Sequence, residues 1–210
     1  MPRPACSPLT VAAALLLAAV SSVPVGAQVA DPAPTPRRHQ IELLALYVSP
    51  TGDPVDEVYG GHPGAAVRYS FQLRPRWSLA GEIGQRQADG STTAFGFPAD
   101  LEVLHAAVLA SYHWGPGVTQ AGRWTAAAGA GVVMQDVEEE VRFPDATVSA
   151  SDSVNGLLLR LGGRWPLGPA WGLTAEGRAT AMEDAESPGG GGEGADFGTF
   201  EVAAGVFFSF

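Results

Sequence analysis

FEVAAGVFFSF, residues 200–210, alternates two kinds of side chain along its whole length. One set of alternate positions is Phe200, Val202, Ala204, Val206, Phe208 and Phe210, and the other is Glu201, Ala203, Gly205, Phe207 and Ser209. A strict period of two predicts a β-strand with one apolar face and one mixed face. Terminal segments are usually polar and frayed, so we expect something outside this strand to cover its apolar face.

Seven further segments have the character of strands. The eight predicted strands cover residues 39–49, 64–73, 77–87, 101–114, 123–135, 154–165, 171–182 and 197–210. Proline supports this division, because it cannot donate to a β-ladder and is excluded from central strands. Each of the seven connections holds at least one proline, and no predicted strand contains any. A helix is the alternative for 101–113, which fits a helical stripe, and for the alanine-rich run 126–133.

All five tryptophans flank the three short connections, residues 74–76, 115–122 and 166–170, which have no acidic residue. In an up-and-down meander alternate connections lie at the same end of the sheet. The predicted ring of aromatic residues at this rim therefore contains Trp77, Trp114, Trp124, Trp165, Trp171, Phe208 and Phe210. Indoles settle where hydrocarbon meets water, so the ring is typical of a membrane-interface girdle. The alternative is that tryptophan is merely common beside turns.

The tryptophans also indicate which face of each strand points outward. Positions counted from them in steps of two carry no charge. The opposite face of the same strands carries Glu82, Arg160, Arg164, Glu176, Arg178 and Glu201. The first two predicted strands have no tryptophan, and their more apolar faces leave Glu42 and Arg68 inward. A soluble barrel would bury the apolar set, whereas an apolar exterior with interior charges is typical of a transmembrane barrel. Lipid cannot satisfy an open sheet edge, so the sequence predicts an all-β, eight-stranded antiparallel up-and-down transmembrane β-barrel in which the last strand closes on the first.

The first residues indicate export. Arg3 precedes an apolar run, residues 9–20, and the small residues 25–27 form a cleavage site, so we predict a cleaved signal peptide at 1–27. A buried N-terminal helix is the alternative. We expect a Pro-rich N-terminal tail at 28–38 and the barrel at 39–210. The only cysteine, Cys6, lies in the predicted signal peptide, so no disulfide or thiol site is expected.

With its terminal Phe210 after the alternating Phe208 and Val206, the chain resembles the OmpA-like and OmpX-like small barrels of bacterial outer membranes. The resemblance covers residues 39–210 and is architectural. It implies that these three residues form the signal that the barrel-assembly machinery reads. It also implies location in the cell outer membrane, with both termini in the periplasm and four loops outside the cell.

The predicted interior points to a structural role. Eight strands enclose a space just wide enough to be filled by side chains, and the four glutamates and four arginines would have to be paired there. We therefore expect a plugged lumen, with a narrow ion path or proton relay as the alternative. His105 and His113 lie about 26 Å apart along one strand and cannot share a metal. Ser111 and His113 share an inward face without a matching acid, so we expect no enzyme.

The remaining expectations concern partners. The acidic segments 135–145 and 183–196 are predicted to be solvated loops, which could bind divalent cations or an extracellular partner. The net charge of −10 argues against nucleic acid. We expect a monomer in the lipid bilayer with no cofactor and no metal site. A structural or surface-interaction role is favoured over a small-solute channel, a soluble lipocalin-like barrel and a lipid-modifying enzyme.

Overall fold

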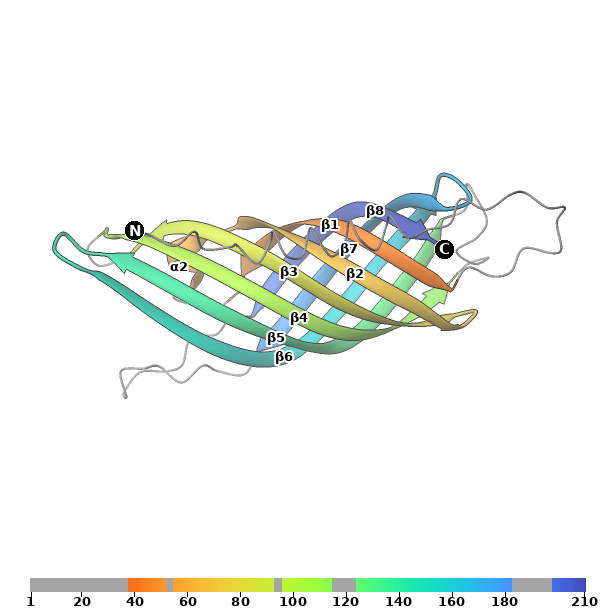
Figure 1. Ribbon diagram of the computed structural model, residues 1–210, viewed down its shortest axis with the longest axis horizontal. Coiled ribbons are helices and arrows are strands. Elements are labelled where there is room, and N and C mark those ends of the chain that lie inside the picture. The colour runs from red at the N-terminus through yellow and green to blue at the C-terminus, as the bar shows by residue number, and fades with distance from the viewer. Residues whose placement is uncertain (1–37, 52–54, 93–95, 115–123, 183–197) are drawn as a thin grey trace, which may run out of the picture. The chain divides into compact units, whose positions relative to one another are not determined.

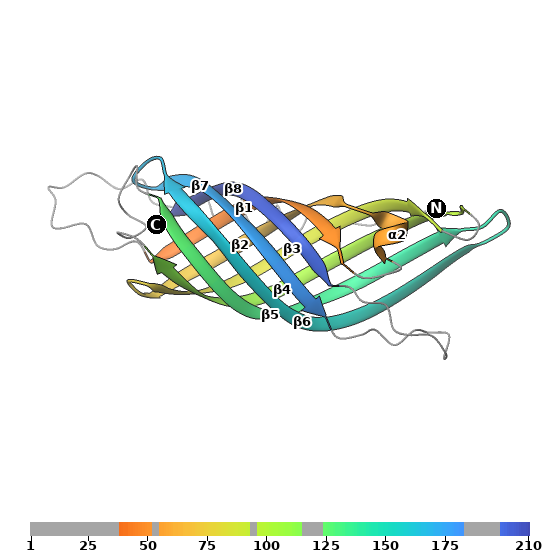
Figure 2. The same cartoon turned by 180° about the vertical axis from the view of Figure 1, so that it is seen from behind.

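The computed structural model describes residues 38–51, 55–92, 96–114, 124–182 and 198–210. Its sheet is a closed antiparallel barrel in which each strand pairs with its sequence neighbours and β8 pairs with β1 (Figures 1 and 2). The strands are β1 (His39–Pro50), β2 (His62–Arg74), β3 (Trp77–Ser91), β4 (Pro98–Trp114), β5 (Thr125–Arg142), β6 (Thr147–Pro166), β7 (Trp171–Met182) and β8 (Thr199–Ser209). The predicted fold class is confirmed, and the predicted signal peptide lies outside the described residues.

Both segments for which a helix was the alternative are strands. Residues 101–113 belong to β4, and residues 126–133 belong to β5. Each pairs with a strand on both sides, β4 with β3 and β5, and β5 with β4 and β6. The tertiary pairing therefore overrides the local helix propensity of the alanine-rich run.

The strands β1 to β6 are longer than predicted and take in four prolines at their ends, whereas β7 has the predicted bounds and β8 is shorter. Pro50 and Pro166 are last residues, Pro98 is a first residue and Pro63 is a second residue. The expectation that no strand contains proline is therefore wrong at the termini. The physical rule concerns central positions, because a terminal residue can lack a ladder donor at little cost.

The acidic segment 135–145 was predicted as a loop, and this prediction is wrong. Residues 135–142 continue β5 and pair with β6 up to the Arg142–Thr147 pair, so only a short turn remains. Val137 points inward and is buried, whereas Asp136 and Glu138 point outward and are exposed. The charged residues masked an alternation of inward and outward side chains that continues from Gln135 to Glu138.

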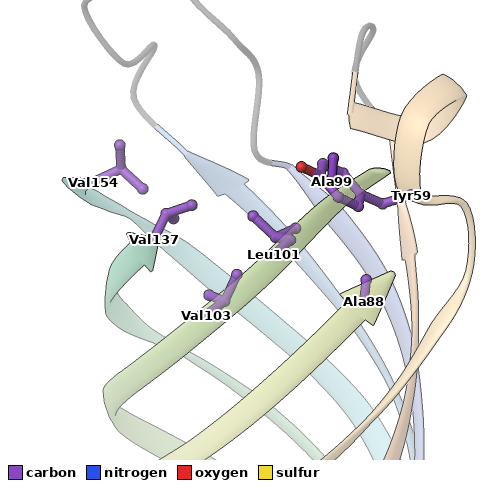
Figure 3. Close-up of a cluster of buried hydrophobic side chains, with 7 residues drawn as sticks. All are labelled: Tyr59, Ala88, Ala99, Leu101, Val103, Val137 and Val154. Atoms are coloured by element: carbon purple, nitrogen blue, oxygen red, sulfur yellow. The ribbon is translucent and has the colours of Figure 1, made fainter. Parts of the chain in front are cut away.

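A short helix, α2 (Val55–Tyr59), interrupts the first long connection. Gly60 ends it with a φ of +55°, a left-handed conformation that glycine adopts without strain. Tyr59 packs into a cluster of buried apolar side chains from β3 to β6 (Figure 3), and its hydroxyl donates to Glu139 at 2.5 Å. A side chain at Gly90 would collide with Val58 and Tyr59, so this glycine lets α2 lie against β3.

Among the described residues no helix is long and apolar enough to span a bilayer.

The two ends of the barrel differ in the elements that they carry. The tryptophan end carries the β2–β3 and β6–β7 turns and the C-terminal Phe210, and the α2 end carries α2 and the β5–β6 turn (Figure 1). At the α2 end β6 continues beyond the end of its ladder with β7, whereas β4 and β5 stay paired up to the Ala99–Val141 pair. The β6–β7 ladder stops at the Gly156–Met182 pair, while β5 and β6 remain paired for nine further residues of β6, 147–155.

Candidate functional site

All eight charged side chains that were predicted inside the barrel are buried, each at most 6 % exposed. The strand register brings most of them to one level. Glu42 of β1 lies opposite Arg68 of β2, which lies opposite Glu82 of β3. On the other side of the barrel Arg160 of β6 lies opposite Arg178 of β7, which lies opposite Glu201 of β8.

Arg68 is the centre of this cluster and is fully buried. Its guanidinium lies 2.7 Å from Glu82, 2.5 Å from Glu176 and 3.2 Å from Glu42. Three carboxylates therefore surround one planar donor group that carries five N–H bonds. A single β2 side chain therefore forms ion pairs with residues of three other strands, β1, β3 and β7.

Arg178 forms a second hub beside the first. It lies 2.7 Å from Glu82, 2.6 Å from Glu176 and 3.4 Å from Glu201. Two of these carboxylates are shared with Arg68. Arg178 and Arg160 lie directly opposite each other on β7 and β6, so their positive charges repel. Glu176 contacts both, at 3.1 Å from Arg160, and offsets this repulsion.

The periphery of the cluster includes Arg86, which sequence reasoning missed, and His105, which the sequence placed on the inward face without predicting its partner. Arg86 binds Glu201 at 3.0 Å, and His105 lies 3.1 Å from Glu82. Arg86 has the same parity on β3 as Glu82, so counting four residues further along the predicted strand would have found it. The remaining member, Arg164, binds Glu42.

The charges of the cluster are paired with one another inside the barrel. Five arginines and four glutamates take part, which leaves a formal charge of +1. Arginine does not release its proton in proteins, so these guanidinium groups cannot pass protons between carboxylates. The arrangement is suited to stabilise the barrel, because removal of one partner would leave the others as buried charges without a counter-charge.

The interior changes character on either side of the cluster. Toward the α2 end, Leu44, Leu46, Val48, Ala66 and Ala203 form a buried apolar group. Toward the tryptophan end most inward side chains are polar, among them Gln40, Ser78, Ser111, His113 and Thr125, although Phe207 and Ala127 are also buried there.

The two histidines that the sequence placed on the inward face of β4 have different contacts. His105 joins the charge cluster, whereas His113 bonds through Nε2 to the Ser78 hydroxyl at 2.8 Å. The Ser111 hydroxyl, which the sequence placed on the same face as His113, has no hydrogen-bond partner among the described residues, and neither has His113 Nδ1. His113 therefore has no carboxylate partner among the described residues, and Ser111 makes no hydrogen bond to it.

The aromatic residues of the predicted girdle all point outward at one rim, and each is between 44 and 61 % exposed. Tyr112 also belongs to this group and was missed, although it lies two residues before Trp114 on the same face. Its ring makes edge contacts with Trp77 and Trp114, with centroids 5.2 and 5.0 Å apart. Phe210 stacks on His39 of β1, with centroids 5.8 Å apart, where the barrel closes.

An apolar band covers the outer wall above this rim and ends sharply. The last apolar outward residues on the four longest strands are Ile83, Leu104, Met134 and Leu157. Beyond them the outward face of β3 to β5 carries Asp89, Asp100, Glu102, Asp136, Glu138 and Glu140. We call this set the acidic face.

Like charges lie directly opposite each other on the acidic face. Asp100 pairs across the sheet with both Asp89 and Glu140, and Glu102 pairs with Glu138. Such pairs are unfavourable by themselves. Arg142 contacts Asp100 and lies 3.1 Å from Glu140, which offsets part of the repulsion. Among the described residues no group of acids and histidines has the geometry to hold a metal ion.

Comparison with solved structures places the fold among small outer-membrane barrels. OprG from Pseudomonas aeruginosa is 15 % identical, with a TM-score of 0.58, and the match covers 83 % of this chain and 96 % of that one. Neisserial surface protein A is 13 % identical, with a TM-score of 0.56 and coverage of 82 and 97 %. A major outer membrane protein from Thermus thermophilus is 15 % identical, with a TM-score of 0.50 and coverage of 82 and 99 %. No protein-family model and no curated protein sequence matches the chain.

Proposed function

We propose that this protein is an integral outer-membrane barrel whose lumen is sealed and whose α2 end binds a cationic polypeptide outside the cell. The membrane location is supported by the apolar band, the interior charges and the closed sheet. A water-soluble barrel with this exterior would expose large apolar side chains on every strand. A bilayer instead covers the band and places the girdle at the periplasmic interface.

The location is tested by cell fractionation and heat modification. The protein should collect in the outer-membrane fraction, and its unboiled form should migrate differently from its boiled form in a detergent gel, because a closed barrel resists detergent at low temperature. A protein found in the soluble periplasmic fraction without a mobility shift would contradict the proposed location.

A sealed lumen is supported by the charge cluster, whose members fill the barrel at one level and are bound to each other. A small-solute channel would need a continuous wet path. In planar lipid bilayers the purified protein should therefore show no steady single-channel conductance. Steady openings of uniform size would instead favour the channel function.

The observation that carries the binding function is the four-stranded extension of β3 to β6 beyond the apolar band. Its outer face is the acidic face, and its inner face carries apolar residues such as Val137 and Val154. Among the described residues no strand pairs with the free edge of β6 at 147–155, which has only one charged residue, Asp152. A free edge pairs readily with an added strand.

The partner that fits this edge is an extended segment with basic residues on one face and apolar residues on the other. The apolar residues would continue the inner face, and the basic residues would lie on the same side as the acidic face. A second copy of this chain fits poorly, because two acidic faces would meet. The proposal includes no catalytic activity.

A synthetic peptide of alternating lysine and valine provides the test, with the barrel held in nanodiscs of zwitterionic lipid. The peptide should bind, and binding should be lost in the variant Asp100→Asn, Glu102→Gln, Glu138→Gln, Glu140→Gln. A control variant, Glu57→Gln with Asp145→Asn, removes exposed acids elsewhere and should bind normally. The same peptide with alternate backbone nitrogens methylated keeps its charge but should bind less tightly. Equal binding by all proteins would refute the proposed surface.

A further inference from the structure

A small cavity of about 20 Å³ lies at the mouth of the barrel at the tryptophan end, between buried interior side chains and the exposed Arg38. The side chains around it are polar and include Arg38, Gln40, Ser78, His113 and Arg164. A cavity of this size holds one water molecule or one ion of similar size, and is too small for a phosphate or an organic molecule.

Two buried side chains at this cavity have nitrogen atoms without a partner among the described residues. Gln40 is 6 % exposed, and its Nε2 has no acceptor. His113 is 4 % exposed, and its Nδ1 has none. In the neutral tautomer in which Nε2 accepts from Ser78, Nδ1 carries the proton, so both nitrogens are donors. An occupant of the cavity should therefore be an acceptor.

The charges around the cavity also favour an occupant that is an anion. The neighbouring cluster has a formal charge of +1, and Arg164 has a single ion-pair partner, Glu42, which it shares with Arg68. Arg38 adds a second positive group beside the cavity, and none of the described residues around the cavity is acidic. A buried charge without a counter-charge is costly, and a water molecule in the cavity would satisfy donors without balancing the charge.

We infer that the cavity at the tryptophan end binds one monatomic anion of the halide class, with chloride as the physiological ion. Arg164 supplies the charge, and Gln40 and His113 supply neutral N–H donors. The bound anion completes the charge balance of the cluster, so it also stabilises the closed barrel. This site is separate from the acidic face and does not depend on what that face binds.

The direct experiment is a crystal of the protein grown or soaked in bromide, with anomalous scattering recorded at the bromine edge. A single bromide in the cavity is the expected result. A cavity that holds only water while bromide is abundant would overturn the inference.

Thermal unfolding in lipid provides the second measurement. The midpoint of the native protein should rise from sodium gluconate to sodium chloride at equal ionic strength, because an anion bound only by the folded state stabilises it. Gln40→Leu should lose this dependence. Gln135→Leu is the matched control, because Gln135 is also buried with an unpartnered Nε2 but does not line this cavity, and it should keep the dependence.

A third variant keeps the test decisive if Gln40→Leu does not fold. Gln40→Glu places a carboxylate at the cavity and supplies the missing negative charge from the chain itself. Its midpoint should be independent of chloride, and its crystals should hold no bromide there. Bromide bound equally by the native protein and Gln40→Glu would show an adventitious ion only and would refute the inference.

Discussion

At the scale of single residues, the sequence determines which side chains enter the barrel but not which of them meet. Parity along each strand placed Glu42 and Arg164 inside, yet the two are 122 positions apart and come together only because the sheet closes. Their contact depends on the tilt and stagger of all eight strands, which no local pattern encodes. This is why the two hubs, Arg68 and Arg178, could not be distinguished in advance from the peripheral arginines.

The hub position of Arg68 leads to a specific prediction. Arg68→Met would leave Glu82 and Glu176 close together with one fewer cation, and removal of one partner from a buried ion pair costs about 3–5 kcal/mol. Urea unfolding in phospholipid vesicles should show a loss of that order. Arg142→Met provides the control, because Arg142 is also paired with two acids but at the exposed surface, and its variant should lose much less stability than Arg68→Met. A similar small effect for both variants would mean that the cluster does not support the wall.

At the scale of elements, the sequence predicted all eight strands and missed their extent at the α2 end. Regular alternation with Pro-rich breaks is a strong signal, so the central strands were found. Residues 135–142 were assigned to a loop because most of them are charged or amide side chains, several of which face water on one side of a projecting sheet. The helix α2 has only five residues, too few for a helical period to show.

The contact between α2 and the sheet should depend on pH. Burial raises the pKa of the Tyr59 hydroxyl above its ordinary value, and the hydrogen bond to Glu139 raises it further. A raised pKa means that the contribution of Tyr59 to stability is complete below the ordinary pKa, near pH 10, and is lost as the pH rises above it. Protection of the β3–β4 amides against hydrogen exchange near α2 should therefore fall in strongly alkaline solution.

Tyr59→Phe separates this effect from general alkaline unfolding. The variant keeps the ring in the apolar cluster and removes the ionisable hydroxyl, so its protection should be weaker at neutral pH and change less above about pH 10. An ultraviolet titration should also show one fewer late-ionising tyrosine than the native protein. A native titration in which every tyrosine ionises near the ordinary pKa would mean that Tyr59 is not held against Glu139.

At the scale of the whole molecule, the sequence pattern and the structure agree on an inverted barrel. The outward residues from the girdle to Leu157 are uncharged on every strand, while the interior holds the charges. This agreement was predictable because a bilayer requires an uncharged outward face on every strand. An error in one strand therefore does not change the conclusion. Function was less predictable, because the acidic face and the small cavity arise from register between strands rather than from any single stretch.

The inverted arrangement can be tested with one residue on the outer wall. Leu161 lies midway along the apolar band on β6 and is 66 % exposed. Leu161→Arg should cost about 2–4 kcal/mol of unfolding free energy in phospholipid vesicles, because arginine is unfavourable at the bilayer midplane. Ser151→Arg lies on the same face of the same strand beyond the band and should be close to neutral. In water both positions would be ordinary exposed sites, so equal stability of the two variants would show that the band does not face lipid.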